Sequence, residues 1–398
     1  MKAIQILFFV LITVSVNSSC QQNPPYPEQN PGNDFPESNP HHPMKDSIEF
    51  LVQKYISDGV PGAQVVVKND DGWFYHAGGY ARIEDQEPFH PGGTAWLFSI
   101  TKTYTATLLM LEKEANTVHL DSLIRAYLPD HILNKISGHE KITVRMLLNH
   151  TSGLVNFTEL PEFVVGQLND PLNQPSIHKR LEMVNGKPLV FEPGSDYMYS
   201  NTNYLLLQLI LEHATGKSYW QLLEDKILDP LQLTHTLNNL SEAQTKSLGF
   251  PDFYFDRHAN LQLENITSWN NALANASDGY GALAATPYDV IRFHEALLGG
   301  ELISDSSLKE MQKWVMGVNS TEYEYGEGFE YWQFKPGSSP QFGHEGDGIG
   351  SSTQFFYVPD NNTYLYIHIN AGRQLYGPYL FKITDMKRDL CRYTANWQ

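Results

Sequence analysis

Residues 97–111 constrain the fold more than any other stretch, because they place a serine and a lysine at helical spacing within an apolar run. Ser99 and Lys102 are three positions apart, and side chains at i and i+3 share one face of a helix. The run from Ala106 to Leu111 is apolar nearly all round, which predicts a buried helix. If Ser99 lies in the first turn, backbone N–H groups and the positive end of the helix dipole lie beside its hydroxyl. The stretch therefore predicts a central helix that carries a serine nucleophile.

Residues 1–19 have the pattern of a secretory signal peptide. A lysine follows the first methionine, an apolar run extends from Ile4 to Val16, and small residues precede Cys20. The apolar run is too short to span a bilayer comfortably. The end of the segment resembles the lipobox of bacterial lipoproteins, in which the cysteine is lipidated and becomes the mature N-terminus, although Asn17 stands where an aliphatic residue is usual. Ordinary signal cleavage with an incidental Cys20 is the alternative.

Residues 20–45 are rich in Pro, Asn and Gln and contain almost nothing that could build a core, which predicts a disordered tether. The second cysteine, Cys391, is expected to be buried and unpaired, because Cys20 lies beside the signal. We therefore expect an exported protein, in the periplasm or on the outer cell surface, that is held to a membrane only by a lipid on Cys20.

The composition excludes several classes of partner. A formal charge of −18 over 398 residues offers no basic stripe for a polyanion, so no nucleic acid partner is expected. No apolar run of about 18 residues follows the signal, so no membrane-spanning helix is expected. The sequence has no His-x-x-x-His pattern, Gly-x-Ser-x-Gly turn, phosphate loop or dinucleotide motif, so neither a metal nor a cofactor is expected. We expect a monomer that acts on a small molecule or a peptide.

Residues 46–396 are expected to form one α/β domain. The segments with strand or helix character are, in chain order, a helix at 47–57, a hairpin of strands 63–68 and 73–77, strands at 329–334, 353–358 and 364–369, and a final helix at 379–393. Strands from both ends of the chain would therefore form one antiparallel sheet with helices packed against it. This α/β part would cover about 46–114 and 286–396, with an inserted, mainly helical part at about 115–285.

Three motifs, in this order, resemble those of the serine β-lactamase and penicillin-binding protein superfamily. They are Ser99-Ile100-Thr101-Lys102 for the nucleophile motif, Tyr199-Ser200-Asn201 for the Tyr-x-Asn motif and His344-Glu345-Gly346 for the His-x-Gly form of the third motif. The sequence is most similar to class C β-lactamases and the related D-Ala-D-Ala carboxypeptidases and esterases, over roughly residues 45–395. A Ser-x-x-Lys spacing alone also occurs in chains whose lysine is solvated, so the order of the motifs carries the assignment. The resemblance implies a β-lactamase-like fold, an antiparallel sheet flanked by helices plus an inserted helical subdomain.

The first two motifs contain residue types that suit acyl transfer. Ser99 would attack a carbonyl group, and Lys102 would be the nearest base if burial lowers its pKa enough for neutral amine to exist. Tyr199 would share or relay the proton and protonate the leaving group, although a core tyrosine bonded to backbone is the alternative. Asn201 would hydrogen-bond either the amine of Lys102 or the amide of a substrate.

The third motif supplies the opposite wall of the expected site. His344 would lie on an edge strand and assist proton handling or orient the substrate, although a structural histidine is the alternative. Gly346 would allow the backbone to approach the substrate closely. The resemblance implies that the oxyanion hole uses the N–H groups of Ser99 and Asp347, the residue after the motif.

Glu345 and Asp347 bear on the choice of substrate. In relatives that cleave peptides with a free carboxylate, Thr or Ser hydroxyls commonly hold that carboxylate at these two positions. Two anions there would repel it, which favours neutral esters, amides or a substrate that carries an amine. The alternative is that both side chains point to solvent.

The sequence therefore predicts a serine hydrolase, related to the β-lactamases, that acts through an acyl-enzyme on an amide or ester at the cell envelope. Two alternatives remain open at this point. The protein could be a D-Ala-D-Ala carboxypeptidase or penicillin-binding enzyme, or it could be a cell-wall binding protein that keeps the scaffold without catalysis. The joint presence of Ser99, Lys102 and Tyr199 argues against the last of these.

Overall fold

The computed structural model describes residues 35–316, 323–335, 337–372 and 378–397. The expected signal peptide, Cys20 and the first part of the expected tether lie outside the described residues. Within the described part, no helix is both long enough and apolar enough to cross a membrane.

The centre of the fold is an antiparallel sheet with the strand order β3-β2-β1-β12-β11-β10-β9-β8. Its strands are β1 (Gly62–Asn69), β2 (Gly72–Arg82), β3 (Glu87–Pro88), β8 (Tyr323–Tyr325), β9 (Glu330–Trp332), β10 (Gln341–Asp347), β11 (Ser352–Val358) and β12 (Thr363–Ile369). The two ends of the chain meet where β1 pairs with β12, with Val65 opposite Ile367. The structure thus confirms an antiparallel sheet built from both ends of the chain.

Alternating side chains on the central strands build two separate cores. Val65 and Val67 of β1 pack in one apolar cluster with Ile367 of β12, whereas Val66 and Tyr366 belong to the other. This follows from the period of two along a strand, which sends successive side chains to opposite faces. Both faces of the sheet are therefore covered, which explains why β1, β11 and β12 contain runs of consecutive apolar or aromatic residues instead of a strict alternation.

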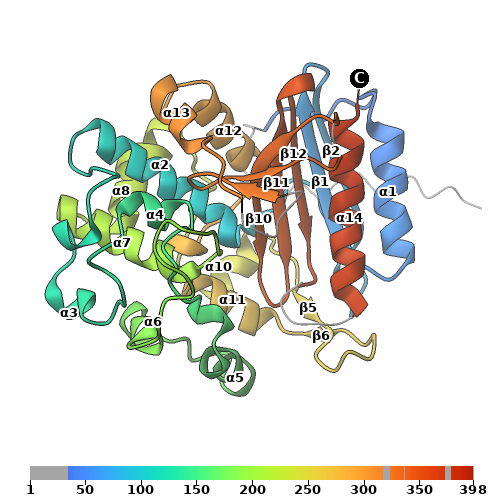
Figure 1. The fold of residues 1–398 in the computed structure, drawn as a ribbon. Helices are drawn as coiled ribbons and strands as arrows, with labels where there is room; N and C mark the ends of the chain where they lie inside the picture. The colour runs from blue at the N-terminus through green and yellow to red at the C-terminus, as the bar shows by residue number, and fades with distance from the viewer. Residues whose placement is uncertain (1–34, 317–322, 336, 373–377, 398) are drawn as a thin grey trace, which may run out of the picture. The chain divides into compact units, whose positions relative to one another are not determined.

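Two long helices cover one face of the sheet. Helix α1 (Lys45–Ser57) and helix α14 (Pro378–Ala395) lie side by side on it (Figure 1). They are joined by an ion pair between Lys54 and Asp389, at 2.9 Å. Cys391 of α14 is buried in this layer and unpaired, as expected.

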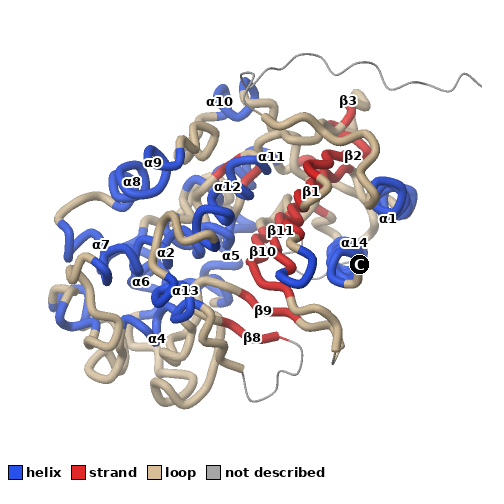
Figure 2. The backbone as a smooth tube through the Cα atoms, turned by 90° about the horizontal axis from the view of Figure 1, so that it is seen from above, coloured by secondary structure: helices blue, strands red, loops and turns tan. Residues whose placement is uncertain are grey.

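The other face carries the nucleophile helix and the helical part of the chain (Figures 1 and 2). The helices there are α2 (Thr101–Glu114), α3 (Asp130–Leu133), α4 (Val144–Leu148), α5 (Pro161–Asn169), α6 (Ile177–Val184), α7 (Asn201–Thr215), α8 (Tyr219–Leu223), α9 (Asp229–Leu231), α10 (Glu242–Ser247), α11 (Thr267–Asn275), α12 (Pro287–Leu298) and α13 (Asp305–Met311). Two small two-stranded sheets accompany them: β4 (Ala95–Trp96) pairs with β7 (Ala284–Ala285), and β5 (Tyr254–Phe255) pairs with β6 (Glu264–Asn265). Helix α2 is apolar or buried along nearly its whole length, as its sequence predicts.

The structure differs from the expected tether in its last residues. Ser38 forms a bridge with Trp73 of β2, and the ring of Phe35 contacts the ring of Tyr288. His42 is buried, and its Nε2 lies 3.0 Å from Oδ1 of Asn69. The segment from residue 35 to 45 therefore packs on the domain, because its few aromatic residues find partners that its composition does not reveal.

Candidate active site

Ser99 lies in a tight turn directly before helix α2. The turn is η1 (Phe98–Ile100), a 3-10 turn, so the serine precedes the α-helix instead of standing in its first α-helical turn. Phe98 has φ of +43°, a left-handed conformation that is uncommon for a residue with a side chain. Such conformations persist only where the surroundings enforce them, and they cluster at functional sites. The nucleophile is therefore set on a constrained backbone.

Lys102 is fully buried beside Ser99. Its Nζ lies 2.9 Å from Oγ of Ser99 and donates to the carbonyl of Tyr280 at 2.8 Å. Burial lowers the pKa of Lys102 well below its ordinary 10.5, and the nearby Glu330 carboxylate opposes this shift only in part. The pair thus has the geometry and the proton affinity that a serine and its base need.

Tyr199 is the second partner of Ser99. Its hydroxyl donates to Oγ of Ser99 at 2.8 Å. Burial raises the pKa of Tyr199 well above 10, although the hydrogen bond to Ser99 lowers it somewhat. At neutral pH Tyr199 is therefore a phenol that can give a proton, whereas Lys102 is the group whose neutral form is favoured.

His150 holds the backbone on both sides of Tyr199 and was not singled out from the sequence. The N–H of Met198 donates to the carbonyl of His150 at 3.1 Å, and the N–H of Ser200 donates to its Nδ1 at 3.2 Å. The rings of His150 and Tyr199 have centroids 4.4 Å apart. Burial lowers the pKa of His150 well below 6.5, so it stays neutral. A role in positioning Tyr199 fits these contacts, and none of the three sequence motifs contains His150.

The third motif lies directly against the nucleophile turn. A Cβ atom added to Gly346 would lie 1.9 Å from the carbonyl oxygen of Leu97 and 3.1 Å from the backbone nitrogen of Ser99. A Cβ atom on Gly348 would lie 2.3 Å from the ring of Phe98. The sequence predicted that Gly346 allows close approach to the substrate, and the structure shows that the close neighbour is the backbone before Ser99. These glycines let the end of β10 meet the serine.

His344 is not on the wall of the site as predicted. It is fully buried below Tyr199, and β10 is not an edge strand, because β9 and β8 lie beyond it. Its Nε2 lies 3.0 Å from the hydroxyl of Tyr325, and its Nδ1 lies 2.5 Å from the carbonyl of Glu345 and 3.3 Å from Oε1 of Glu330. Burial lowers the pKa of His344 to about 3, so it is neutral. The alternation of side chains explains the error, because it is Glu345 and Asp347 that reach the cavity.

Glu345 and Asp347 do not point to solvent, as one of the alternatives held. Both line the cavity, and both contact the ammonium of Lys387 in α14, at 2.6 Å and 3.4 Å. Lys387 is buried and also donates to Oγ of Ser352 at 2.8 Å. The hypothesis that these carboxylates repel a substrate carboxylate did not include this buried cation.

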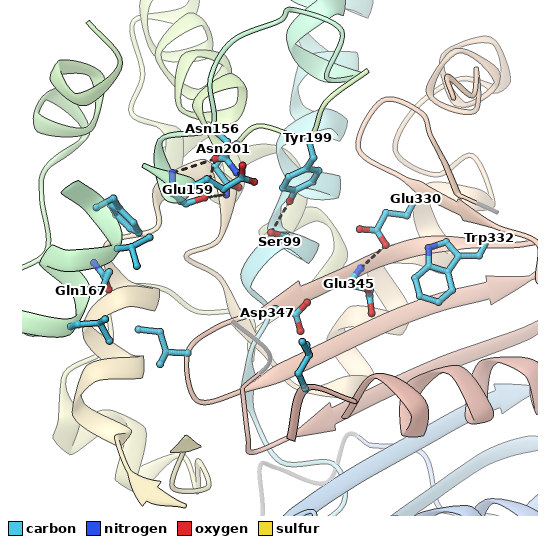
Figure 3. A pocket seen from close by; sticks show the side chains of 16 residues that line it. Ser99, Asn156, Glu159, Gln167, Tyr199, Asn201, Glu330, Trp332, Glu345 and Asp347 are labelled. Carbon is cyan, nitrogen blue, oxygen red and sulfur yellow. Dashed lines mark hydrogen bonds between the residues drawn. The ribbon is translucent and has the colours of Figure 1, made fainter. Parts of the chain in front are cut away.

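A cavity of about 860 Å³ opens onto Ser99 and Tyr199. Figure 3 shows Ser99 and Tyr199 between a group that contains Asn156 and Glu159 and the strand residues of β9 and β10. The apolar part of the wall is formed by Phe163, Val164 and Leu168 of α5, with Ile349 and Leu380. The strand part is formed by Glu330, Trp332, Glu345 and Asp347. The cavity is large enough for a small molecule or the end of a peptide.

Asn201 lines the same cavity at the start of α7. Its Nδ2 donates to Oγ1 of Thr158 at 3.1 Å, and its buried Oδ1 has no hydrogen-bond partner within the described part of the chain. Lys102 bonds Ser99 and Tyr280, and the described contacts include none between it and Asn201. The side chain of Asn201 is thus held at the cavity wall by Thr158, and among the described contacts it does not bind the amine of Lys102.

The described residues contain no group of three or more His, Cys, Asp or Glu side chains that could hold a metal ion. The charged groups around Ser99 instead pair with one another, as Lys387 does with Glu345. Ser99 lies between a base, Lys102, and an acid, Tyr199, and this arrangement suits nucleophilic catalysis.

Comparisons with known proteins agree with this geometry. The sequence pattern of the family described as Beta-lactamase matches residues 47–376. Penicillin-binding protein 4* of Bacillus subtilis is 26% identical over 313 residues, which cover 77% of this chain and 67% of that protein. Other curated relatives match over only 37% to 50% of their own lengths, so the chain spans half of those proteins or less.

Two solved structures have the same fold. The D-stereospecific amidohydrolase from Streptomyces sp. is 27% identical with a TM-score of 0.72, and the match covers 82% of this chain and 94% of that one. The D-amino acid amidase from Ochrobactrum anthropi SV3 is 24% identical with a TM-score of 0.75, covering 88% and 97%.

The fold, the serine with its two partners and these matches define a serine hydrolase. The chain belongs to the β-lactamase family, whose match extends over most of its length.

Gly346→Ala should damage both the site and the fold. The added methyl group would overlap the carbonyl of Leu97, so β10 and the nucleophile turn must separate. We expect a loss of esterase activity of about 100-fold or more and a lower melting temperature, measured by ester hydrolysis and thermal unfolding. Gly166→Ala in α5 is the matched control, because a Cβ atom there meets nothing within 4 Å. Full activity in Gly346→Ala would contradict the close contact.

Proposed function

We propose that this protein hydrolyses an amide or an ester through an acyl-enzyme on Ser99. The observation that carries the proposal is that Oγ of Ser99 lies 2.9 Å from the buried amine of Lys102 and 2.8 Å from the hydroxyl of Tyr199, at the wall of an open cavity. The serine can lose its proton on one side and receive one for the leaving group on the other.

In the acylation step, Oγ of Ser99 attacks the carbonyl carbon while its proton passes to neutral Lys102. The oxyanion that forms would be held by the N–H groups of Ser99 and Asp347. The close approach of Gly346, the residue before Asp347, to the backbone nitrogen of Ser99 supports this part of the proposal. The C–N or C–O bond then breaks, and the leaving group takes a proton from Tyr199, which recovers it from Lys102. A water molecule attacks the acyl-enzyme by the same route and frees the acid and Ser99.

The substrate is proposed to be neutral or to carry an amine. Four carboxylate side chains line the cavity, those of Glu159, Glu330, Glu345 and Asp347, and within the described part of the chain no lysine or arginine is among the lining residues. Such a wall disfavours a substrate anion. The names of two structural relatives, a D-stereospecific amidohydrolase and a D-amino acid amidase, support amides of D-configured amino acids as the first substrates to test.

A penicillin-binding or D-Ala-D-Ala carboxypeptidase activity is the second candidate. The observation that favours it is the match to Penicillin-binding protein 4* over 77% of this chain. It requires a place for a substrate carboxylate, which the carboxylates along β10 disfavour.

Intact-mass spectrometry tests the two candidates together. The domain is incubated with an activated neutral ester, with a D-amino acid amide and with a penicillin, and wild type is compared with Ser99→Ala. We expect hydrolysis of the ester or the amide that disappears in Ser99→Ala, without a stable penicillin adduct. A stable adduct that requires Ser99 would favour the penicillin-binding candidate. If none of the three compounds gives a change that depends on Ser99, a non-catalytic binding protein is favoured.

The pH dependence of kcat/KM should reflect Lys102. Because burial lowers its pKa, the neutral base forms below pH 10.5, and kcat/KM should rise tenfold per pH unit up to that pKa and then level off. His150 and His344 are neutral over this range, since burial also lowers their pKa values. Lys102→Arg should lose about 1000-fold or more at every pH, because a guanidinium keeps its proton. Lys113→Arg, on the same helix but with a partly exposed side chain, is the control. Activity that falls as the pH rises from 6 to 9 would exclude Lys102 as the base.

Export and lipid anchoring at Cys20 are also part of the proposal, supported by the sequence of residues 1–20. We expect the protein in the membrane fraction of the cells that make it and, after Cys20→Ala, in a soluble fraction. Membrane association that survives Cys20→Ala would argue against the lipid.

A further inference from the structure

Lys387 is a buried cation behind the strand wall of the cavity. It belongs to α14, on the opposite side of β10 from the nucleophile helix, and only 1% of its side chain is exposed. Its ammonium contacts Oε1 of Glu345 at 2.6 Å, Oγ of Ser352 at 2.8 Å and Oδ1 of Asp347 at 3.4 Å. An ammonium has three hydrogens, so these three oxygens can use all of them.

Burial of the Lys387 ammonium costs hydration free energy that an apolar side chain at the same position would not cost. Its neighbours on α14, Met386, Leu390 and Cys391, are all buried in the apolar layer between the helix and the sheet. A charge in such a layer loses its hydration, and paired apolar residues of similar size are often as stable as a buried ion pair. Packing alone therefore does not require a lysine here.

The partners of Lys387 connect it to the site. Glu345 and Asp347 line the same cavity as Ser99, and Gly346 between them touches the nucleophile turn. The ammonium consequently contributes one positive charge directly behind the carboxylates of Glu345 and Asp347. This charge acts on a substrate bound in the cavity, because Coulomb interactions extend beyond direct contact in a partly desolvated site.

We infer that Lys387, through its pair with Glu345, is a specificity-determining residue that sets the charge a substrate can carry beside β10. Removal of the lysine makes the wall more negative by one charge, and neutralisation of Glu345 makes it less negative by one. The two changes should therefore shift the preference between anionic and neutral substrates in opposite directions. This inference rests on the proposed function, since it assumes that the substrate is bound in this cavity.

The test uses three aryl esters that share one leaving group and differ only at the end of the acyl chain, which is a carboxylate, a neutral amide or an ammonium. The quantity measured is kcat/KM for the anionic ester divided by kcat/KM for the neutral one. In Lys387→Met this ratio should fall about five- to tenfold, and in Glu345→Gln it should rise by a similar factor. The ratio of the cationic to the neutral ester should change in the reverse sense. High salt should weaken both shifts.

Lys382→Met is the matched control. It makes the same substitution on the same helix, but Lys382 donates to the backbone carbonyl of Asp58 in α1's C-terminal cap, away from the cavity. Its ratio should equal that of wild type. Because Lys387→Met removes a cation from beside two carboxylates, it can lose stability; Glu345→Gln, which keeps the shape of the side chain, then decides the question alone.

A charge ratio is a readout that a purely structural role of Lys387 would not move, because loss of packing lowers all three rates together. Unchanged ratios in Lys387→Met and Glu345→Gln, or shifts in the same direction, would overturn the inference. Failure of the proposed function is recognised separately, as wild type that hydrolyses none of the esters. In that case the binding constants of the three esters are measured by calorimetry in the Ser99→Ala background, and their ratios decide in the same way.

Discussion

The burial of one amine organises this structure. Lys102 has no exposed surface, and its Nζ is surrounded by Oγ of Ser99, the carbonyl of Tyr280 and the rings of Tyr199, Tyr204 and Tyr280, at 5.0 to 5.4 Å from the amine. Removing water from an ammonium favours its neutral form, which is the form that accepts a proton from a serine. Water is excluded from Lys102 on helix α2 because α7 and the turn η5 (Asp278–Tyr280) pack on this helix from one side and the strands from the other. The chemistry of the site is thus a consequence of how completely the nucleophile helix is enclosed.

The second constraint is the contact between the sheet and the nucleophile turn. Gly346 and Gly348 allow β10 and the following loop to lie against Leu97 and Phe98 without side chains between them. The two walls of the cavity belong to different parts of the chain, so their separation is fixed by this contact. Backbone packing at this contact therefore holds the two walls of the cavity together.

Much of the fold follows from the sequence by simple rules. The hairpin of β1 and β2, the strands β11 and β12, and helices α1 and α14 all arise from periodicities of two or 3.6 with recognisable turns between them. The order of the three motifs was enough to bring Ser99, Lys102 and Tyr199 together. In each case the information lies within a few neighbouring residues.

What the sequence did not reveal depends on contacts between distant segments. His344 was expected on the wall, but register places Glu345 and Asp347 there, and a shift of one residue exchanges the faces of a strand. Lys387 follows Asp347 by 40 residues, with all of β11 and β12 between them, so no local pattern links the two. The left-handed conformation of Phe98 likewise depends on what surrounds it, because its residue type does not favour it.

The pairing of β1 with β12 has a consequence for how the protein is made. These neighbouring strands come from opposite ends of the domain, so the ribosome releases β12 only after nearly all of the chain. Until then β1 exposes the backbone groups of an unpaired edge, which invites pairing with other chains. Closing so long a loop is also slow compared with local folding. A nascent chain that already contains Ser99, Lys102 and Tyr199 therefore lacks both the sheet and the wall of β10, and the enzyme matures only when its last strands arrive.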